Sequence, residues 1–202
     1  MNQMQDLETY DPELTVPRLF FDRVAELGSR TALRKKDLGL WRDISWAEYG
    51  RKARQTAMGL TALGLEPGQA VAVIGENSPE WLYTDMGAMA AGGVTVGIYT
   101  TNAAEECGYI LGHSEARIYI VEDEEQLDKA LAVRADCPSL KKIVVIDTEG
   151  LRKFRDPMVL SFDELLELGQ KFDQENPGAF EDRLASRGTE DVALLIYTSG
   201  TT

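Results

Sequence analysis

The sequence is poor in the residues that build disulfide frameworks and metal centres. It contains two cysteines, Cys107 and Cys137, and a single histidine, His113, among 202 residues. The cysteines form no C-x-x-C pair, which argues against a zinc ribbon or a thioredoxin-like redox motif. A disulfide between the two stays open, but two buried thiols in a reducing compartment are the simpler interpretation.

Long apolar runs and an excess of positive charge are also missing. The longest apolar stretches fall well short of the roughly 20 residues that a membrane-spanning helix requires. Residues 1–6 have neither a basic region nor an apolar core, so we expect no secretory signal. With 34 acidic and 21 basic residues, the formal charge of −13 disfavours nucleic acid and anionic membrane surfaces as partners. The cytoplasm is therefore the expected compartment.

What remains is the composition of an ordinary globular protein, and its apolar residues follow a regular pattern. Short apolar segments, which we interpret as strands, occupy 71–74, 94–98, 117–121, 142–146 and 192–197. Helices are predicted between them: one opens at Ser78 and Pro79, one at the pair Asn102 and Glu105, one spans 125–132, and one opens at the pair Ser161 and Glu164. This alternation predicts an α/β fold, with a mainly parallel sheet flanked by helices on both faces.

The first third of the chain adds a helix and a hairpin. A helix is predicted from 15–17 to Leu27, followed by a small β-hairpin of 31–35 and 40–44. Ser45 and Glu48 match a capping box that opens a further helix, and Gly64 is placed to end it. We expect residues 1–14 to be a flexible N-terminus, and the polar connections 147–160 and 170–191 to be flexible as well.

The last apolar strand runs directly into a hydroxyl-rich glycine loop, residues 198–202. Gly200 permits positive φ and a close approach to a ligand. Successive small residues can direct several backbone N–H groups into one anion nest, and four hydroxyls can donate to phosphate oxygens. Neither the Walker pattern nor the G-x-G of dinucleotide-binding loops occurs in the chain. On composition alone, a phosphate loop and an ordinary polar turn both stay open.

Several upstream segments decide between these interpretations, and they occur in order over about 17–202. They read W-R-D-I-S-W-A-E-Y at 41–49, G-L-E-P-G at 64–68, G-E-N-S-P-E-W at 75–81, A-A-G-G-V at 90–94, I-Y-T-T-N at 98–102 and H-S-E-A at 113–116. Together with Y-T-S-G-T-T at 197–202, they resemble the N-terminal region of the adenylate-forming superfamily of acyl-CoA synthetases and luciferase-like enzymes. The resemblance is strongest to the long-chain fatty acyl-CoA synthetases.

This resemblance implies that residues 15–202 are the N-terminal part of the large AMP-binding domain of an ATP-dependent long-chain fatty acid–CoA ligase. Such enzymes join a carboxylate to the α-phosphate of Mg-ATP, release pyrophosphate, and then transfer the acyl group to coenzyme A. The implied ligands are ATP, Mg²⁺, coenzyme A and a fatty acid. The residues implied to hold the β- and γ-phosphates are Thr198, Ser199, Gly200, Thr201 and Thr202. None of these five is implied to be an acid, a base, a nucleophile or a metal ligand.

The chain departs from the family pattern at two places. Gly97 stands where a proline often precedes Ile-Tyr, and the sequence stops before the glycine, proline and lysine that complete the family loop. The acyl pocket, the magnesium-holding glutamate and the C-terminal catalytic lysine of the family are also missing. We therefore expect the 202-residue chain to be inactive alone, and to self-associate if the last strand normally pairs with later sequence. The parent is expected to be cytoplasmic, with peripheral membrane association left open.

Two other functions stay open. The chain can be a non-catalytic binding or assembly module that ends at this loop. Alternatively, the parent can be another adenylating enzyme, such as an aryl-CoA ligase or an acyl-carrier-protein ligase.

Three further features have simple structural explanations. His113 follows a helical pattern, where an interaction with the helix end is simpler than catalysis. The acidic run 122–125 suggests a metal site, but acidic residues are favourable at the start of any helix. Trp46 and Trp81 fall in first helical turns and are expected to pack against the sheet, whereas Tyr99 follows a strand near the ligand edge and stays open.

Overall fold

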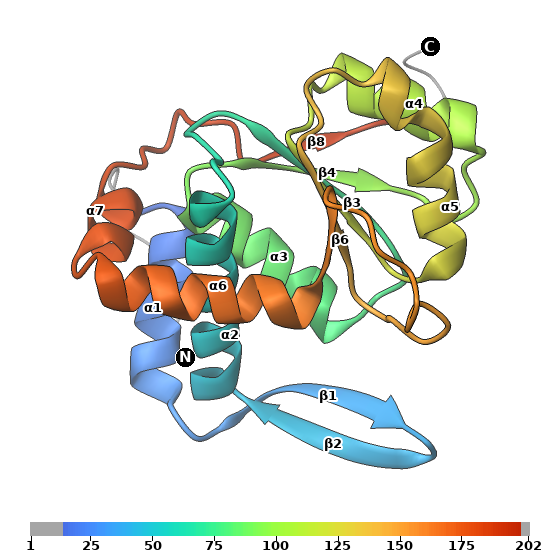
Figure 1. The fold of residues 1–202 in the computed structure, drawn as a ribbon. Coiled ribbons are helices and arrows are strands. Elements are labelled where there is room, and N and C mark those ends of the chain that lie inside the picture. Colours follow the sequence, from blue (N-terminus) through green and yellow to red (C-terminus); the bar gives the residue numbers. More distant parts are fainter. Residues whose placement is uncertain (1–13, 199–202) are drawn as a thin grey trace, which may run out of the picture.

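The computed structural model describes residues 14–198, which form a six-stranded sheet between two layers of helices (Figure 1). The strands lie in the order β7-β6-β5-β3-β4-β8, and every neighbouring pair is parallel. Their bounds are β3 (Ala70–Ile74), β4 (Val94–Ile98), β5 (Ile118–Val121), β6 (Lys142–Val145), β7 (Val159–Ser161) and β8 (Leu194–Ile196). The predicted α/β fold with a mainly parallel sheet is confirmed. The flexibility expected for residues 1–14 falls, apart from Leu14, outside the described residues.

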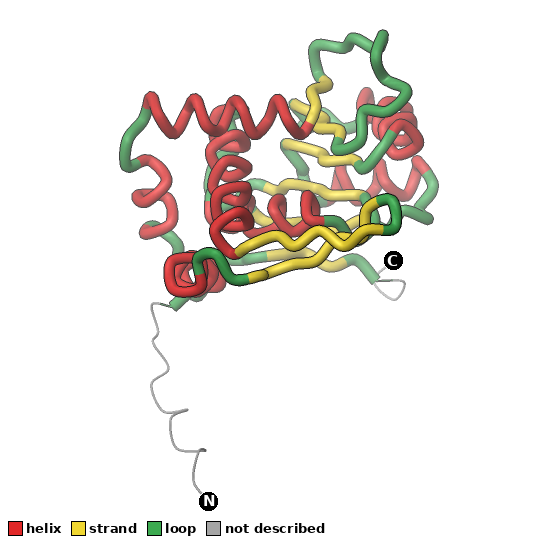
Figure 2. Tube along the Cα trace, turned by 90° about the horizontal axis from the view of Figure 1, so that it is seen from below, coloured by secondary structure: helices red, strands yellow, loops and turns green. Residues whose placement is uncertain are grey.

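Helices cover both faces of the sheet, as Figure 2 shows from below. One layer consists of α1 (Val16–Leu27), α2 (Trp46–Ala62), α3 (Pro79–Ala90), α6 (Phe162–Glu175) and α7 (Ala179–Ala185). The other consists of α4 (Ala104–His113) and α5 (Glu124–Val133), followed by the short 3-10 helix η1 (Arg134–Asp136). Side chains of β3 alternate between the two cores: Val71 and Val73 pack into the first, and Ala72 and Ile74 into the second. Burial on both faces explains why the strands read as continuous apolar runs.

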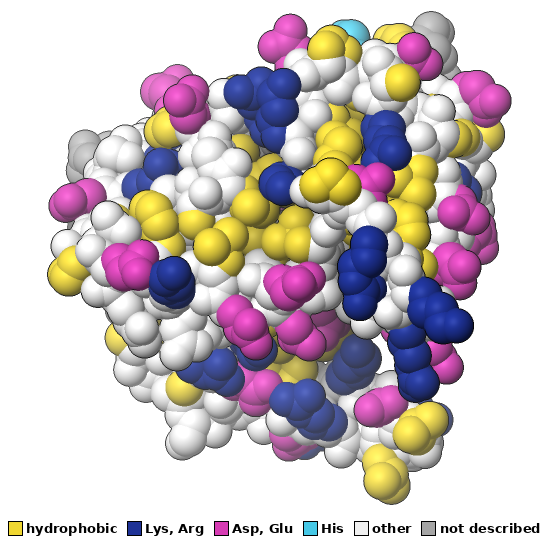
Figure 3. All heavy atoms as spheres, viewed as in Figure 1, with side chains coloured by type: hydrophobic (Ala, Val, Ile, Leu, Met, Phe, Trp, Pro, Cys, Tyr) yellow, Lys and Arg dark blue, Asp and Glu magenta, His cyan; other side chains and the backbone are white. Residues whose placement is uncertain are grey.

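A two-stranded hairpin projects from the helical layer, as predicted (Figure 1). Strands β1 (Thr31–Asp37) and β2 (Leu40–Ser45) pair in antiparallel fashion. The two turn residues, Leu38 and Gly39, both have positive φ, at 45° and 85°. Positive φ at both positions is typical of the turn that matches the twist of a two-stranded ribbon. Leu38 is almost fully exposed, and Figure 3 shows hydrophobic side chains at this tip among charged ones.

Three of the predicted helix caps are confirmed, and the one predicted for α4 is wrong. Ser45, Ser78 and Ser161 each accept a hydrogen bond from the backbone N–H three residues later. The predicted pair Asn102 and Glu105 does not open α4. The N–H of Asn102 donates to the carbonyl of Tyr99 in a turn, so the helix begins one residue later. The carboxylate of Glu106 then accepts from the N–H at position 103, at 2.9 Å.

Two elements lie inside connections that the sequence predicts to be irregular. Strand β7 occupies the end of the connection 147–160 and pairs with β6, and α7 lies within 170–191. Helix α7 starts after Gly178, whose φ of 88° lies in the left-handed region that glycine adopts without strain. Both elements are short, so their sequence patterns are too brief to reveal them.

The cysteines behave as the simpler interpretation predicts. Cys107 and Cys137 are both free and buried, in the core between the sheet and the layer of α4 and α5. Burial raises the pKa of both thiols above their usual range. They therefore act as small apolar core residues in this fold.

Candidate functional site

Three parallel strands of the sheet end beside one another and open into a cleft of about 450 Å³. Gly75 and the two residues after it follow β3, Tyr99 and Thr100 follow β4, and Tyr197 follows β8. Helix α3 contributes Trp81 to the same cleft. Ligands of open parallel sheets bind beyond the carboxyl ends of the strands, so this is the expected position for a ligand.

The predicted phosphate loop leaves the sheet at this cleft. Thr198 is exposed and lies two residues after the end of β8. The other four predicted site residues, 199–202, lie outside the described residues, so their phosphate-binding role stays a prediction. Hydrogen bonds fix the register of β8 against β4. Leu194 pairs with Thr95, and the N–H of Thr95 donates to the carbonyl of Ala193 at 3.0 Å.

A polar network joins the loops that follow β3, β4 and β5. The hydroxyl of Thr100 donates to Oε1 of Glu76 at 2.8 Å, and the N–H of Glu76 donates to Oε2 of Glu122, also at 2.8 Å. From α5, Nζ of Lys129 donates to the carbonyl of Thr100 at 2.7 Å. Segments that resemble the family separately, at 75–81 and 98–102, are thus in direct contact. The network fixes the rim of the cleft with bonds to charged groups.

The acidic run beside this network serves the start of α5. Asp123 caps the helix, because its carboxylate accepts from the N–H of Gln126 at 3.1 Å. Glu125 lies 3.4 Å from Nζ of Lys129, one turn further on. Within residues 14–198, no group of three or more acidic, histidine or cysteine side chains is arranged to hold a metal ion.

His113 has a different partner from the predicted one. Its Nδ1 lies 2.7 Å from the hydroxyl of Tyr197, within hydrogen-bonding distance, and the two rings meet edge to face with centroids 5.7 Å apart. The ring of Tyr109 also stacks on the imidazole, with 5.8 Å between the centroids. The sequence predicts an interaction with the end of the helix, which is wrong about the partner. The side chain instead reaches the residue that begins the predicted loop, because α4 ends beside the carboxyl end of β8.

The three aromatic residues Trp46, Trp81 and Tyr99 differ in burial, as their positions in the sequence suggest. Trp46 is partly buried and stacks on Tyr49, with centroids 6.3 Å apart. Trp81 packs partly into the same core and also lines the cleft. Tyr99 is 68% exposed at the cleft, which keeps it available for a ligand. A Cβ on Gly97 would stand at an ordinary 3.7 Å from the ring of Trp81, so glycine is not required here by lack of space.

One carboxyl group in the cleft is poorly solvated. Asp85 on α3 lines the cleft beside Thr95 of β4. Burial raises the pKa of Asp85 above its usual value, and the nearby Thr95 hydroxyl opposes that rise. An apolar setting of this kind favours the neutral acid.

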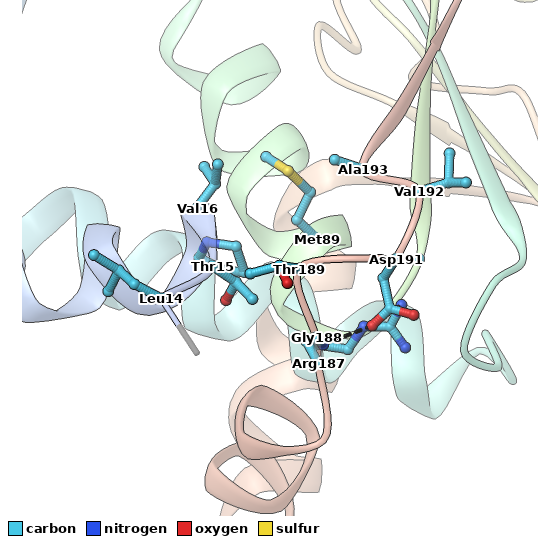
Figure 4. A pocket seen from close by; sticks show the side chains of 12 residues that line it. Leu14, Thr15, Val16, Met89, Arg187, Gly188, Thr189, Asp191, Val192 and Ala193 are labelled. Carbon is cyan, nitrogen blue, oxygen red and sulfur yellow. Dashed lines mark hydrogen bonds and ion pairs between the residues drawn. The ribbon is translucent and has the colours of Figure 1, made fainter. Parts of the chain in front are cut away.

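A second cavity lies at the opposite end of β8 and is shown in Figure 4. It encloses about 180 Å³ between the start of α1 and the segment 187–193. Its wall includes an ion pair in which Nη2 of Arg187 lies 3.0 Å from Oδ2 of Asp191, drawn as a dashed line in Figure 4. This cavity faces the amino ends of the strands, away from the predicted loop. The cleft at the carboxyl ends is therefore the candidate functional site.

The cleft at the carboxyl ends of the strands places this chain among the open parallel α/β domains that bind their ligands at that edge. Residues 20–202 match the family described as AMP-binding enzyme, and the chain belongs to that family. The resemblance noted in the sequence is thereby confirmed.

Relatives with curated descriptions include long-chain-fatty-acid–CoA ligases. The chain is 37% identical to ACSBG1 of Rattus norvegicus over 188 residues, which is 93% of this chain and 25% of that protein. It is 35% identical to ACSBG2 of Homo sapiens over 193 residues, which is 96% of this chain and 28% of that protein. The chain thus spans about a quarter of the length of the curated relatives that it matches.

Solved structures of adenylate-forming enzymes share the fold. The anthranilate CoA ligase AuaEII, in complex with anthranoyl-AMP, is 25% identical with a TM-score of 0.75, over 95% of this chain and 33% of that one. The A domain of carboxylic acid reductase from Segniliparus rugosus is 19% identical with a TM-score of 0.73, over 92% of this chain and 34% of that one. Across the described part of the chain, no helix has both the length and the apolar character needed to span a bilayer.

Proposed function

We propose that residues 15–202 are the N-terminal part of the large AMP-binding domain of an ATP-dependent long-chain fatty acid–CoA ligase. The observation that supports this proposal is the position of β8, which brings Tyr197, the residue before the predicted loop, to the cleft at the carboxyl edge of the sheet. Family membership and the names of the relatives support the reaction class. In this proposal the whole protein, and not this part alone, carries the activity.

The predicted loop holds the leaving pyrophosphate. Hydroxyls of Thr198, Ser199, Thr201 and Thr202 donate to the β- and γ-phosphate oxygens, and Gly200 lets the backbone approach them. Fixed donors of this kind stabilise the charge that gathers on the phosphates as the bond to the α-phosphate breaks. They act by position, without gaining or losing a proton.

Magnesium fits this site only as an ion that arrives with the nucleotide. Glu76 lines the cleft, but its carboxylate already accepts from Thr100, and that of Glu122 accepts from the backbone of Glu76. Since the residues 14–198 form no ready metal cluster, we propose that the protein ligands of Mg²⁺ come from elsewhere in the polypeptide. When bound, the ion would neutralise part of the negative charge on the phosphates.

The proposed substrates are a long-chain fatty acid, ATP and coenzyme A. The fatty acid carboxylate attacks the α-phosphate, which forms acyl-AMP and releases pyrophosphate. The thiolate of coenzyme A then attacks the acyl carbonyl and releases AMP. We further propose that the protein is cytoplasmic. Cell fractionation followed by a high-salt wash tests this, because the wash releases a pool that is bound peripherally to membranes and so distinguishes it from a cytosolic pool.

The test uses the protein translated from the complete reading frame. Supplied with MgATP, palmitate and coenzyme A, it should form AMP, pyrophosphate and the acyl thioester in equal amounts. Thr198→Val should lower kcat/KM for MgATP by about tenfold or more, because one fixed phosphate donor is lost. The matched control is Thr189→Val, at the opposite end of β8, which should leave the rate unchanged.

Other outcomes separate the alternatives. Thioester formation only with an aryl acid, or only on an acyl carrier protein, would identify a different adenylating enzyme. No AMP with any of these acids, together with a reading frame that ends at Thr202, would favour the non-catalytic module. The 202-residue chain alone should produce no AMP above the blank, and measurable turnover would overturn that part of the proposal.

A further inference from the structure

The residue that begins the predicted phosphate loop is held by the end of a helix. Tyr197 follows β8 directly and is half-buried, and its hydroxyl lies 2.7 Å from Nδ1 of His113 on α4. These two residues are 84 positions apart in the sequence. The contact therefore joins α4, the helix that follows β4, to the end of β8, the strand that pairs with β4.

The surroundings of the Tyr197 hydroxyl are built by the same helix end. Tyr109, one turn earlier on the same helix, stacks on the imidazole with 5.8 Å between the ring centroids. Burial, and then the neighbouring Tyr109, raise the pKa of Tyr197, while the hydroxyl of Ser114 opposes the rise. The phenol thus stays neutral and able to hydrogen-bond over the whole physiological range.

The contact does not depend on which imidazole nitrogen carries the proton. When Nε2 carries it, the phenol O–H donates to Nδ1. When Nδ1 carries it, the imidazole donates to the phenol oxygen instead. The role open to His113 is therefore one of position rather than proton transfer.

We propose that His113 is a positioning residue, which fixes Tyr197 and thereby the entry of the phosphate loop for binding of the nucleotide. This inference rests on the proposed function of the loop. Consecutive Cα atoms are about 3.8 Å apart, so a fixed Tyr197 confines the first phosphate donor, Thr198, to a small volume. A phosphate donor that is confined before binding has less conformational entropy to lose when the triphosphate arrives.

The contact itself can be tested in the 202-residue chain, since His113 is its only histidine and gives a single imidazole signal in an NMR spectrum. Tyr197→Phe removes the hydroxyl but keeps the ring, and it should shift the Cε1–H resonance of His113. Tyr99→Phe is the matched control at the far side of the cleft and should leave that resonance in place. An unchanged resonance in Tyr197→Phe would overturn the contact.

The positioning role is tested by kinetics on the complete protein. His113→Leu removes the polar partner and should raise KM for MgATP by about tenfold, with KM for the fatty acid unchanged. His113→Asn places an amide near the position of Nδ1 and should restore most of the loss. The double variant with Tyr197→Phe should be no worse than His113→Leu alone, because both substitutions remove one shared interaction.

These experiments distinguish failure of the positioning role of His113 from failure of the proposed function. If the complete wild-type protein makes no acyl-AMP, the proposed function fails, whatever the variants do. If it is active and His113→Leu lowers only the melting temperature, with KM for MgATP unchanged, His113 is structural and the inference is overturned. Should His113→Leu fail to fold, the same comparison is made with Tyr197→Phe, which keeps the ring packing.

Discussion

The guanidinium group of Arg54 on α2 donates two hydrogen bonds to the carboxylate of Asp173 on α6. Nε lies 2.6 Å from one carboxylate oxygen, and Nη2 lies 2.9 Å from the other. The same guanidinium stands over the ring of Phe180 on α7, 4.4 Å from its centroid, and also pairs with Glu181. One side chain thus connects α2 to α6 and α7, and its partners on those two helices lie more than one hundred residues later in the sequence.

Removing this group should loosen the outer helices. We expect Arg54→Met to lower the free energy of unfolding by about 1–3 kcal/mol, because charged hydrogen bonds are lost. Arg54→Lys should recover less than half, since an ammonium group cannot form the two-pronged pair or the stacked contact. Urea unfolding measures both. Arg51→Met, at an exposed position one turn earlier, is the control and should change stability little.

Acid should weaken the cap of α6. The carboxylate of Glu164 accepts from the N–H of Ser161 at 2.7 Å and from its hydroxyl, and these bonds lower the pKa of Glu164 below its usual 4.5. A lowered folded-state pKa means that the stabilisation is complete above the unfolded pKa and is lost as pH falls through the folded one. Ser161→Ala should therefore cost about 1 kcal/mol at pH 7 and progressively less below about pH 4.5.

The pH series needs a comparison on the same helix. Glu167→Gln, on the exposed side of α6, should show no such change between neutral and acidic urea titrations. A constant cost of Ser161→Ala at every pH would mean that the bond between the Ser161 hydroxyl and the Glu164 carboxylate does not stabilise the cap.

The contact between α2 and α6 depends on the absence of a side chain. A Cβ on Gly169 would lie 1.8 Å from the carbonyl oxygen of Gln55, whose backbone cannot retreat without disturbing α2. We expect Gly169→Ala to cost about 3 kcal/mol or more, or to prevent folding. Gly112→Ala in α4 meets nothing within 4 Å and should be neutral or stabilising by up to about 1 kcal/mol. Thermal unfolding of the pair gives the answer, and equal melting temperatures would contradict it.

The exposed edge at β8 should make the 202-residue chain self-associate. Ile196 is 70% exposed on a strand whose second edge is unpaired within residues 14–198. We expect light scattering to show a mass above that of the monomer at high concentration, and Ile196→Lys to restore the monomer. Leu38→Lys, at the hairpin tip, is the matched control. If that substitution alone dissolves the assembly, the hairpin and not β8 is the contact.

The sequence predicts the sheet well because each central strand is buried on both faces and so appears as an apolar run. Local chemistry also predicts the serine caps, since a cap needs only residues three positions apart. The cap of α4 was missed because the turn at Tyr99 uses Asn102 first. The pair of His113 and Tyr197 depends on how a helix end lies against a distant strand, which no local pattern records. The phosphate-binding role of the loop stays a prediction, since four of its five residues lie outside the described part of the chain.

The pairing of β8 with β4 also has a consequence for how the chain folds during synthesis. Leu194 meets Thr95, about one hundred residues earlier, whereas β3, β4, β5 and β6 follow one another at short intervals. Closing so long a loop costs more entropy, so we expect β8 to dock last, after the other strands have left the ribosome. Until then the edge of β4 has unpaired backbone N–H and C=O groups, with which a strand of another chain can pair. That interval is when a nascent chain of this family would gain most from a chaperone.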